Sequence, residues 1–203
     1  MSLRRTPALS AALLVIVALT LAACARVRVN AEDLPGRLVF QPVDPLEKVS
    51  RETAFFPRAE ATADVARGET ASFQFVVRAA GVLRGLKAEA FDLRSEAGRL
   101  GPARVGYIGY VRMGRTTAES GRDRLSTPSG YYPDPILASP PDLVPPLTTQ
   151  PVWVSVPVPK DAPPGLYKGK VVLSGDLDGH PFRIERPCAA RVYPPVVDKT
   201  RLW

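Results

Sequence analysis

Hydrophobic residues alternate with other residues in several short runs along the chain. The clearest run, at Val152, Val154, Val156 and Val158, has the two-residue period of a strand with two unlike faces. Comparable runs bounded by turn residues fall at 38–40, 61–65, 71–77, 86–93, 103–113, 171–173 and 180–193, and no convincing amphipathic helix lies among them. The pattern predicts an all-β fold, an immunoglobulin-like antiparallel β-sandwich of roughly 8–9 strands.

The segment 150–173 predicts two strands joined by a proline-rich corner. Pro157 and Pro159 cannot donate to a sheet ladder, so we expect the first strand to lie at a sheet edge or to carry a bulge. Residues 161–165 then turn the chain into a strand that starts near Tyr167, the position from which a corner tyrosine bonds to backbone upstream. Trp153 points away from its valine neighbours, and we expect it to fill a core rather than lie on the surface.

The first 23 residues are typical of a helical signal peptide. Arg4 and Arg5 precede an apolar run, from Ala8 to Ala23, that is too short to span a membrane. The run ends in Leu-Ala-Ala-Cys, which resembles a bacterial lipobox and implies cleavage between Ala23 and Cys24, with lipid attached to Cys24. We therefore expect a lipoprotein anchored to the membrane through Cys24. The alternatives are an ordinary signal peptide with an incidental cysteine and an uncleaved anchor.

After this segment, the chain divides into three parts. Residues 24–36 form a polar tether, residues 37–195 form the sandwich, and residues 196–203 form a tail, because Pro194 and Pro195 should stop sheet pairing. Alanine rather than aspartate follows Cys24. By analogy with other lipoproteins, this favours the outer membrane of the cell envelope if the organism has one.

Charge and cysteine content narrow the classes of function. The formal net charge is +7 and falls by two, to +5, when Arg4 and Arg5 are removed. The basic residues are scattered, without a lysine-rich run or an aromatic RNA-binding motif, so we expect no nucleic-acid partner. Lipidation of Cys24 would leave Cys188 without a partner, and we expect it to be a buried small hydrophobe rather than a reactive thiol.

No constellation of residues predicts a metal, a cofactor or catalysis. Asp176 and Asp178, with Gly179, could offer oxygens to calcium, but further ligands are lacking and Asp-Gly between two strands favours a hairpin turn. His180 is the only histidine, which makes a zinc site or a catalytic triad improbable. The remaining acids are isolated in turns or on strand faces.

Three motifs carry a resemblance to a known family. They are the corner segment 150–173, the heptapeptide Tyr131–Leu137, and Ala66–Glu69 followed by Ser72–Gln74. Together they resemble the N-terminal β-sandwich domain of glycoside hydrolase family 123. The resemblance implies that a (β/α)₈ barrel carries the family's adjacent Asp-Glu pair for hydrolysis of N-acetylhexosaminides. No barrel follows before Trp203, so we expect this chain to be non-catalytic, as a truncated product or a free-standing copy.

The proline-rich segment 114–146 is the strongest candidate for a functional site. It is predicted to be a long loop, and loops of this length are functional or disordered. Tyr131 and Tyr132 lie close to Asp134, a combination of aromatic faces and a carboxylate that suits sugar binding. Packing against a barrel and a plain structural role stay open for these three residues. Trp203 would belong to the same interdomain contact.

Three functions therefore compete. The leading hypothesis is a membrane-anchored accessory domain that positions a catalytic barrel or contacts glycan. The second is a stand-alone carbohydrate-binding lipoprotein that uses Tyr131–Asp134. The third is a structural envelope protein that binds another protein through a sheet edge. By contrast, we expect Arg67, Glu69 and Gln74, which match family positions, to be structural: an Arg–Glu pair in a turn and a glutamine bonded to backbone.

Overall fold

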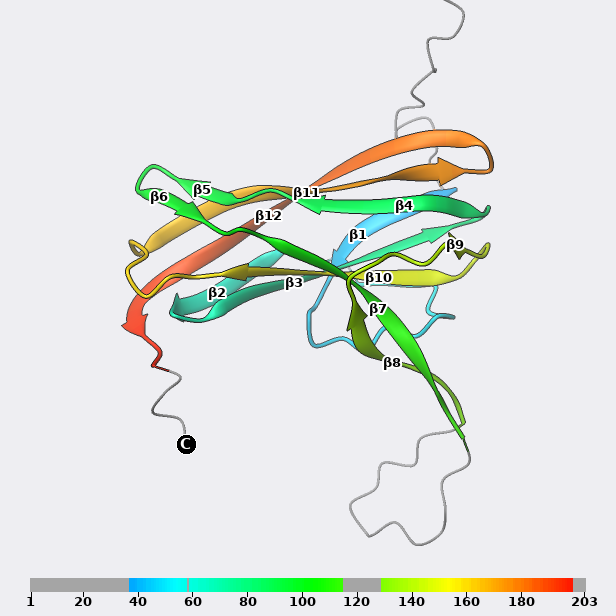
Figure 1. Cartoon of the computed structure of the whole chain (residues 1–203), viewed down its shortest axis with the longest axis horizontal. Coiled ribbons are helices and arrows are strands. Elements are labelled where there is room, and N and C mark those ends of the chain that lie inside the picture. The colour runs from blue at the N-terminus through cyan, green and yellow to red at the C-terminus, as the bar shows by residue number, and fades with distance from the viewer. Residues whose placement is uncertain (1–36, 58, 115–128, 199–203) are drawn as a thin grey trace, which may run out of the picture.

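The computed structural model describes residues 37–57, 59–114 and 129–198, and their regular secondary structure is entirely β (Figure 1). The predictions for Ala23, Cys24 and Trp203 lie outside these residues. The strands are β1 (Leu38–Val43), β2 (Thr62–Arg67), β3 (Thr70–Ala79), β4 (Leu83–Ala90), β5 (Leu93–Ser95), β6 (Gly98–Leu100), β7 (Arg104–Met113), β8 (Gly130–Leu137), β9 (Leu143–Val144), β10 (Thr149–Pro157), β11 (Gly165–Leu177) and β12 (His180–Val196).

The strands form two sheets, which confirms the predicted all-β sandwich. One sheet, here called sheet A, has the order β1-β3-β10-β7-β8, and the other, sheet B, has the order β2-β12-β11-β4-β9 with β5 and β6 attached to β11. Among the pairs that the structure describes, only β2 and β12 run parallel. Three strands, β5, β6 and β9, have three residues or fewer, and nine are longer, in line with the expected number.

The core lies between the two sheets. Alternate residues of β10 and β3 point into it, and Phe40 of β1 stacks on Phe75 of β3 with ring centroids 5.4 Å apart. Val152, Val154 and Val156 are almost completely buried, as their alternation predicts. Burial of this apolar surface supplies the main stabilisation of the fold, because no disulfide closes the described chain.

The placement of β10 differs from the sequence prediction. β10 is an interior strand, paired with β3 along its whole length and with β7 at residues 152–155. Pro157 is tolerated because it lies outside the residues paired with β7, and Pro159 lies beyond the strand. The prediction that Trp153 fills a core is also wrong. Trp153 is half-buried on the outer face of sheet A and lies outside the core.

Two local predictions are confirmed. The Tyr167 hydroxyl donates to the carbonyl of Pro163 over 2.7 Å, which closes the proline-rich corner between β10 and β11. Asp178 and Gly179 form a two-residue hairpin turn between β11 and β12, with φ values of 52° and 87°. Both residues have the positive φ that the tightest hairpin turns need, and glycine adopts it without strain.

Residues 44–57, which follow β1, cover part of the outer face of sheet A. Val49 is buried there with Val43 and Val76, in a small second core. The Gln74 side-chain amide donates to the carbonyls of Asp44 and Glu47, so the glutamine does bond backbone, as predicted. This segment therefore fixes one half of the outer face and leaves the half around Trp153 open.

The C-terminal end of β12 contradicts the prediction that Pro194 and Pro195 end the sheet. Pairing with β2 continues past a register shift to Val196, which lies opposite Arg67. The amide of Val197 then donates to the carbonyl of Arg67 over 2.8 Å. The two prolines are accommodated because a bulge leaves inserted residues outside the ladder. The sheet thus extends into the stretch that was predicted to be a free tail.

Candidate functional site

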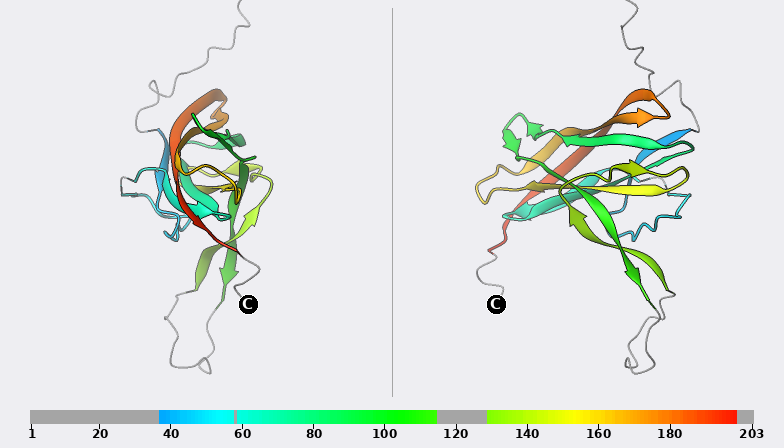
Figure 2. Two further views of the ribbon diagram at one scale, coloured as in Figure 1. Left: turned by 90° about the vertical axis from the view of Figure 1, so that its left-hand side faces the viewer. Right: turned by 45° about the vertical axis from the view of Figure 1, so that its right-hand side comes forward.

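The predicted long loop 114–146 contains two strands, β8 and β9, and β8 belongs to a protruding arm. β7 pairs with β10 only at residues 104–107, and beyond Tyr107 its partner in the sheet is β8 alone. Figures 1 and 2 show the β7–β8 pair leaving the body of the sandwich as a twisted two-stranded ribbon. Pro133 and Pro135 suggested a loop, but β8 is the last strand of its sheet, where missing N–H donors are tolerated.

The arm carries the apolar inner face of sheet A beyond the point where sheet B covers it. Side chains alternate along β7, so Val111 and Met113 lie on the same side as the buried Tyr107. Their exposed fractions are 41% and 45%, and Leu137 of β8, which faces Tyr107 in the register, is 48% exposed. The half-buried Tyr132 faces Val111. We call Val111, Met113, Tyr132 and Leu137 the overhang.

The opposite side of the arm is held against residues 44–57 by an arginine between two tyrosines. The Arg51 guanidinium lies 5.1 Å from the ring centroid of Tyr131 and 5.6 Å from that of Tyr110. The Tyr110 hydroxyl donates to the carbonyls of Val49 and Thr149, and burial raises the pKa of Tyr110 although Arg51 opposes the shift. These contacts fix the arm's direction relative to the sandwich.

The base of the arm is tied to sheet B through Tyr107. The amide of Ala88 in β4 donates to the Tyr107 hydroxyl over 2.8 Å, and the tyrosine is buried. A cavity of about 260 Å³ opens beside it, lined by Leu137 of the overhang and by Leu143 of β9. Polar residues, among them Arg51, Thr148 and Gln150, line the same cavity, which lies between the overhang and the end of the sandwich.

The candidate residues of β8 do not form one platform. Tyr131 and Tyr132 are neighbours in a strand, so their rings lie on opposite faces. Tyr131 contacts Arg51 on the outer side, whereas Tyr132 belongs to the overhang. Asp134 is exposed and lies at a bulge, where residues 134 and 135 face Gly109 alone. Sequence reasoning missed Arg51, Tyr107 and Val111, because strand pairing, not sequence proximity, brings them to the arm.

The expected polar turn at residues 66–69 is built differently from the prediction. Glu69 accepts a hydrogen bond from the amide of Ala66 over 2.7 Å, and Arg67 donates to the carbonyl of Pro194 over 2.8 Å. Thus no ion pair joins Arg67 to Glu69 among the described residues. Both side chains bond backbone instead, which is a structural role.

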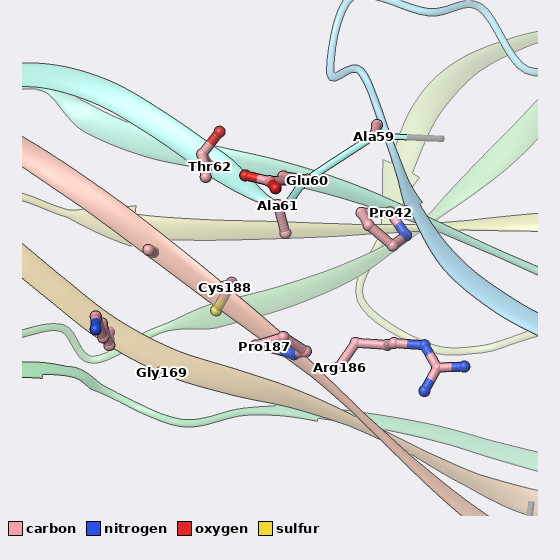
Figure 3. Close-up of a pocket in the computed structure, with 11 residues that line it drawn as sticks. Pro42, Ala59, Glu60, Ala61, Thr62, Gly169, Arg186, Pro187 and Cys188 are labelled. Carbon is pink, nitrogen blue, oxygen red and sulfur yellow. The ribbon is translucent and has the colours of Figure 1, made fainter. Parts of the chain in front are cut away.

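A cavity of about 540 Å³ lies away from the arm, between β12 and residues 59–62 (Figure 3). Cys188 and Pro187 of β12 and Ala61 line it. Cys188 is buried, as predicted, and burial raises the pKa of its thiol to about 11. The thiol therefore stays protonated at neutral pH and is a poor nucleophile, so this cavity has no activated group.

A third cavity, of about 440 Å³, opens on the outer face of sheet A beside Trp153. Three polar side chains, those of Thr70, Arg104 and Ser155, line it together with apolar residues that include Trp153, Ile136 and Leu137. Within the ranges that the structure describes, no group of acids, histidines and cysteines could hold a metal ion, and no helix is long and apolar enough to cross a membrane.

Comparison with known proteins identifies the family. The model of the glycoside hydrolase 123 N-terminal domain matches residues 50–175, which is more than half of the chain. The chain belongs to this family. The resemblance inferred from the three sequence motifs is thereby confirmed, and all three motifs fall largely within the matched segment. The comparison with curated proteins gave no match.

One solved structure supports the fold of the glycoside hydrolase 123 N-terminal domain. A family 123 glycoside hydrolase from Clostridium perfringens, studied for glycolipid glycan hydrolysis, is 15% identical, with a TM-score of 0.57 over 79% of this chain and 28% of that chain. The chain thus spans about a quarter of that enzyme. The CooA pilin subunit of enterotoxigenic Escherichia coli is 13% identical over 78% of this chain and 99% of that one, with a TM-score of 0.38 that is too low to bear on function.

Proposed function

We propose that this chain supplies the accessory, non-catalytic β-sandwich domain of a family-123-like glycoside hydrolase. In this proposal the overhang packs against a catalytic (β/α)₈ domain that acts on N-acetylhexosaminides. The observation that carries the proposal is the uncovered apolar inner face of the arm at Val111, Met113 and Leu137. Family membership indicates what would cover it, because the matched model describes an N-terminal domain.

The geometry of the arm favours a docking role. A two-stranded ribbon is marginally stable by itself in water, and here one of its faces is already held by Arg51 and by the carbonyls of Val49 and Thr149. The other face presents neighbouring apolar side chains, a feature typical of interaction surfaces. Tyr132 lies in this face, so we assign it to the interdomain contact, while Tyr131 and Asp134 lie outside it.

The docking surface can be tested in trans. The mature chain with Cys24→Ser would be titrated with the catalytic domain of a family 123 enzyme from the same genome, using calorimetry. Val111→Asp and Leu137→Asp should each weaken binding at least about tenfold, because a buried carboxylate without a partner is costly. Leu166→Asp in β11, at a residue exposed to the same degree as Val111, is the matched control and should bind normally.

Two outcomes would contradict the proposal. Equal binding by the two arm variants and the control would show that the overhang is not the docking surface. Hydrolysis of N-acetylhexosaminides by the purified mature chain alone would show that it is not a non-catalytic domain.

We further propose that the domain is anchored to the membrane of the cell envelope, with residues 24–36 as the tether. The order of Arg4 and Arg5, the apolar run and the Leu-Ala-Ala-Cys sequence supports lipidation of Cys24. A lipid-anchored domain would hold a hydrolase close to the envelope surface. This arrangement suits an enzyme whose glycans lie outside the cell.

Lipid attachment gives a clear prediction. Cys24→Ser should abolish processing and leave a precursor that retains residues 1–23, because the cysteine thiol is the site of lipid transfer. Mass spectrometry of the membrane fraction would detect this change, and Cys188→Ser is the control that should be processed normally. A mature wild-type protein that starts at Ala25, or that lacks added lipid mass, would exclude the lipoprotein.

A further inference from the structure

The open half of the outer face of sheet A has the features of a ligand site. The cavity of about 440 Å³ lies within the range of small-molecule clefts. Of the overhang residues only Leu137 reaches its lining, whereas Val111 and Met113 face the opposite side of the sheet. Three strands and the end of β8 form it, so its side chains are positioned by paired backbone rather than by a loop.

Trp153 is the central apolar group of this cavity. It is half-buried, and its indole N–H donates to the hydroxyl of Ser155 over 3.1 Å, which fixes the orientation of the ring. The polar group of the indole is therefore satisfied within the protein. What Trp153 offers to the cavity is apolar ring surface.

Gly106 makes room for Ile136 on the outer face of the sheet. The register places Gly106 of β7 directly opposite Trp153, and a Cβ at this position would overlap the Cγ2 atom of Ile136. The missing side chain thus lets Ile136 lie across β7. Ile136 and Trp153 both line the cavity.

Polar groups surround this apolar floor. Ser155 lies opposite Arg104 in the register, and Thr70 lies opposite Pro157 at the end of β10. Arg104 is exposed, and its side chain makes no hydrogen bond or ion pair to any other described residue. No carboxylate is among the lining residues. The site therefore combines an aromatic surface with hydroxyl and guanidinium donors, and it does not repel anions.

We propose that this groove binds a pyranose residue of a glycan, with the apolar C–H face of the ring stacked on Trp153. The hydroxyls of the sugar would accept hydrogen bonds from Arg104. They would also donate hydrogen bonds to the Thr70 hydroxyl or accept them from it. A sugar ring fits better than a protein segment, because the cavity is small, at about 440 Å³, and Thr70, Arg104 and Ser155 border its apolar surface. That surface is formed by Trp153 and Ile136 with Val105, Leu137, Ala138 and Pro157. The proposal can be tested separately from the docking of the arm, because Val111 and Met113 of the overhang do not line the groove.

Tryptophan fluorescence gives a direct test, because the chain has only two tryptophans, Trp153 and Trp203. The mature chain with Cys24→Ser and Trp203→Phe would be titrated with disaccharides of N-acetylgalactosamine, N-acetylglucosamine and glucose. At least one should give a saturable change with a Kd of about 1 mM. Binding followed by calorimetry should weaken at least about tenfold in Trp153→Ala and less in Trp153→Phe, with melting temperatures confirming that both variants fold.

Each other result has a defined meaning. No saturable change with any of these sugars, or calorimetric binding by Trp153→Ala equal to that of the parent chain, would overturn the proposal. If Trp153→Ala instead weakens only the complex with the catalytic domain, the groove is a protein contact and the sugar site is excluded. Val111→Asp should keep sugar binding whether or not it loses docking, so failure of one proposal is distinguishable from failure of the other.

Discussion

Tyr107→Ala is expected to lower the free energy of unfolding by about 3–5 kcal/mol, the range measured when a buried aromatic ring is removed. Tyr107 of β7 is 4% exposed and packs in the core between sheets A and B. It lies at the point where the arm leaves the sandwich. The substitution also leaves the amide of Ala88 without its partner. Equilibrium denaturation by urea, followed by far-UV circular dichroism, would measure the loss.

Two further variants separate the loss of the Tyr107 hydroxyl from the loss of its buried ring. Tyr107→Phe keeps the ring and removes the hydroxyl, and it should cost about 1–3 kcal/mol because the Ala88 amide would be buried without an acceptor. Tyr193→Ala is the control for loss of an exposed ring, at 44% exposure, and should be nearly neutral. If Tyr107→Ala costs no more than Tyr193→Ala, the arm is not held by its base and its direction has another cause.

The features that sequence alone predicted are those that neighbouring residues determine. The alternation at Val152, Val154 and Val156 gives a strand, and the spacing from Pro163 to Tyr167 gives the corner. Asp178 and Gly179 give the hairpin because they supply positive φ. In each case the partners lie within a few residues, so the local sequence contains all the information required.

The errors concern features that depend on which strands become neighbours. Proline content placed β10 at an edge and made β8 a loop, whereas sheet order puts β10 inside and β8 at the edge. Alternation showed that Trp153 faces away from the core valines, but whether a second layer covers that face depends on residues 44–57. The overhang could not be predicted from the sequence, because it depends on how far sheet A extends beyond sheet B.

One family-like motif acquires a specific role from the structure. The turn at residues 66–69 binds the chain that follows Pro194 and Pro195: Arg67 donates to the carbonyl of Pro194 and accepts from the amide of Val197. A salt bridge from Lys160 to Asp198 adds a third contact. We infer that this turn fixes the direction in which the chain leaves the sandwich at Val197 and Asp198.

Gly68→Ala should therefore both destabilise the domain and release this segment. Gly68 has a φ of 86°, which costs an L-residue about 1–2 kcal/mol, and its added Cβ would lie 2.5 Å from the carbonyl oxygen of Val197. Gly179→Ala is a matched control, because its φ is 87° and nothing lies within 4 Å of the new Cβ. Both variants should lose stability because alanine is strained at a positive φ. Gly68→Ala should lose about 1 kcal/mol more, together with the hydrogen-exchange protection of the Val197 amide. If the two variants lose equal stability and Val197 stays protected, the turn does not hold the end of β12, and the direction of the chain there is set by the pairing of β2 with β12 alone.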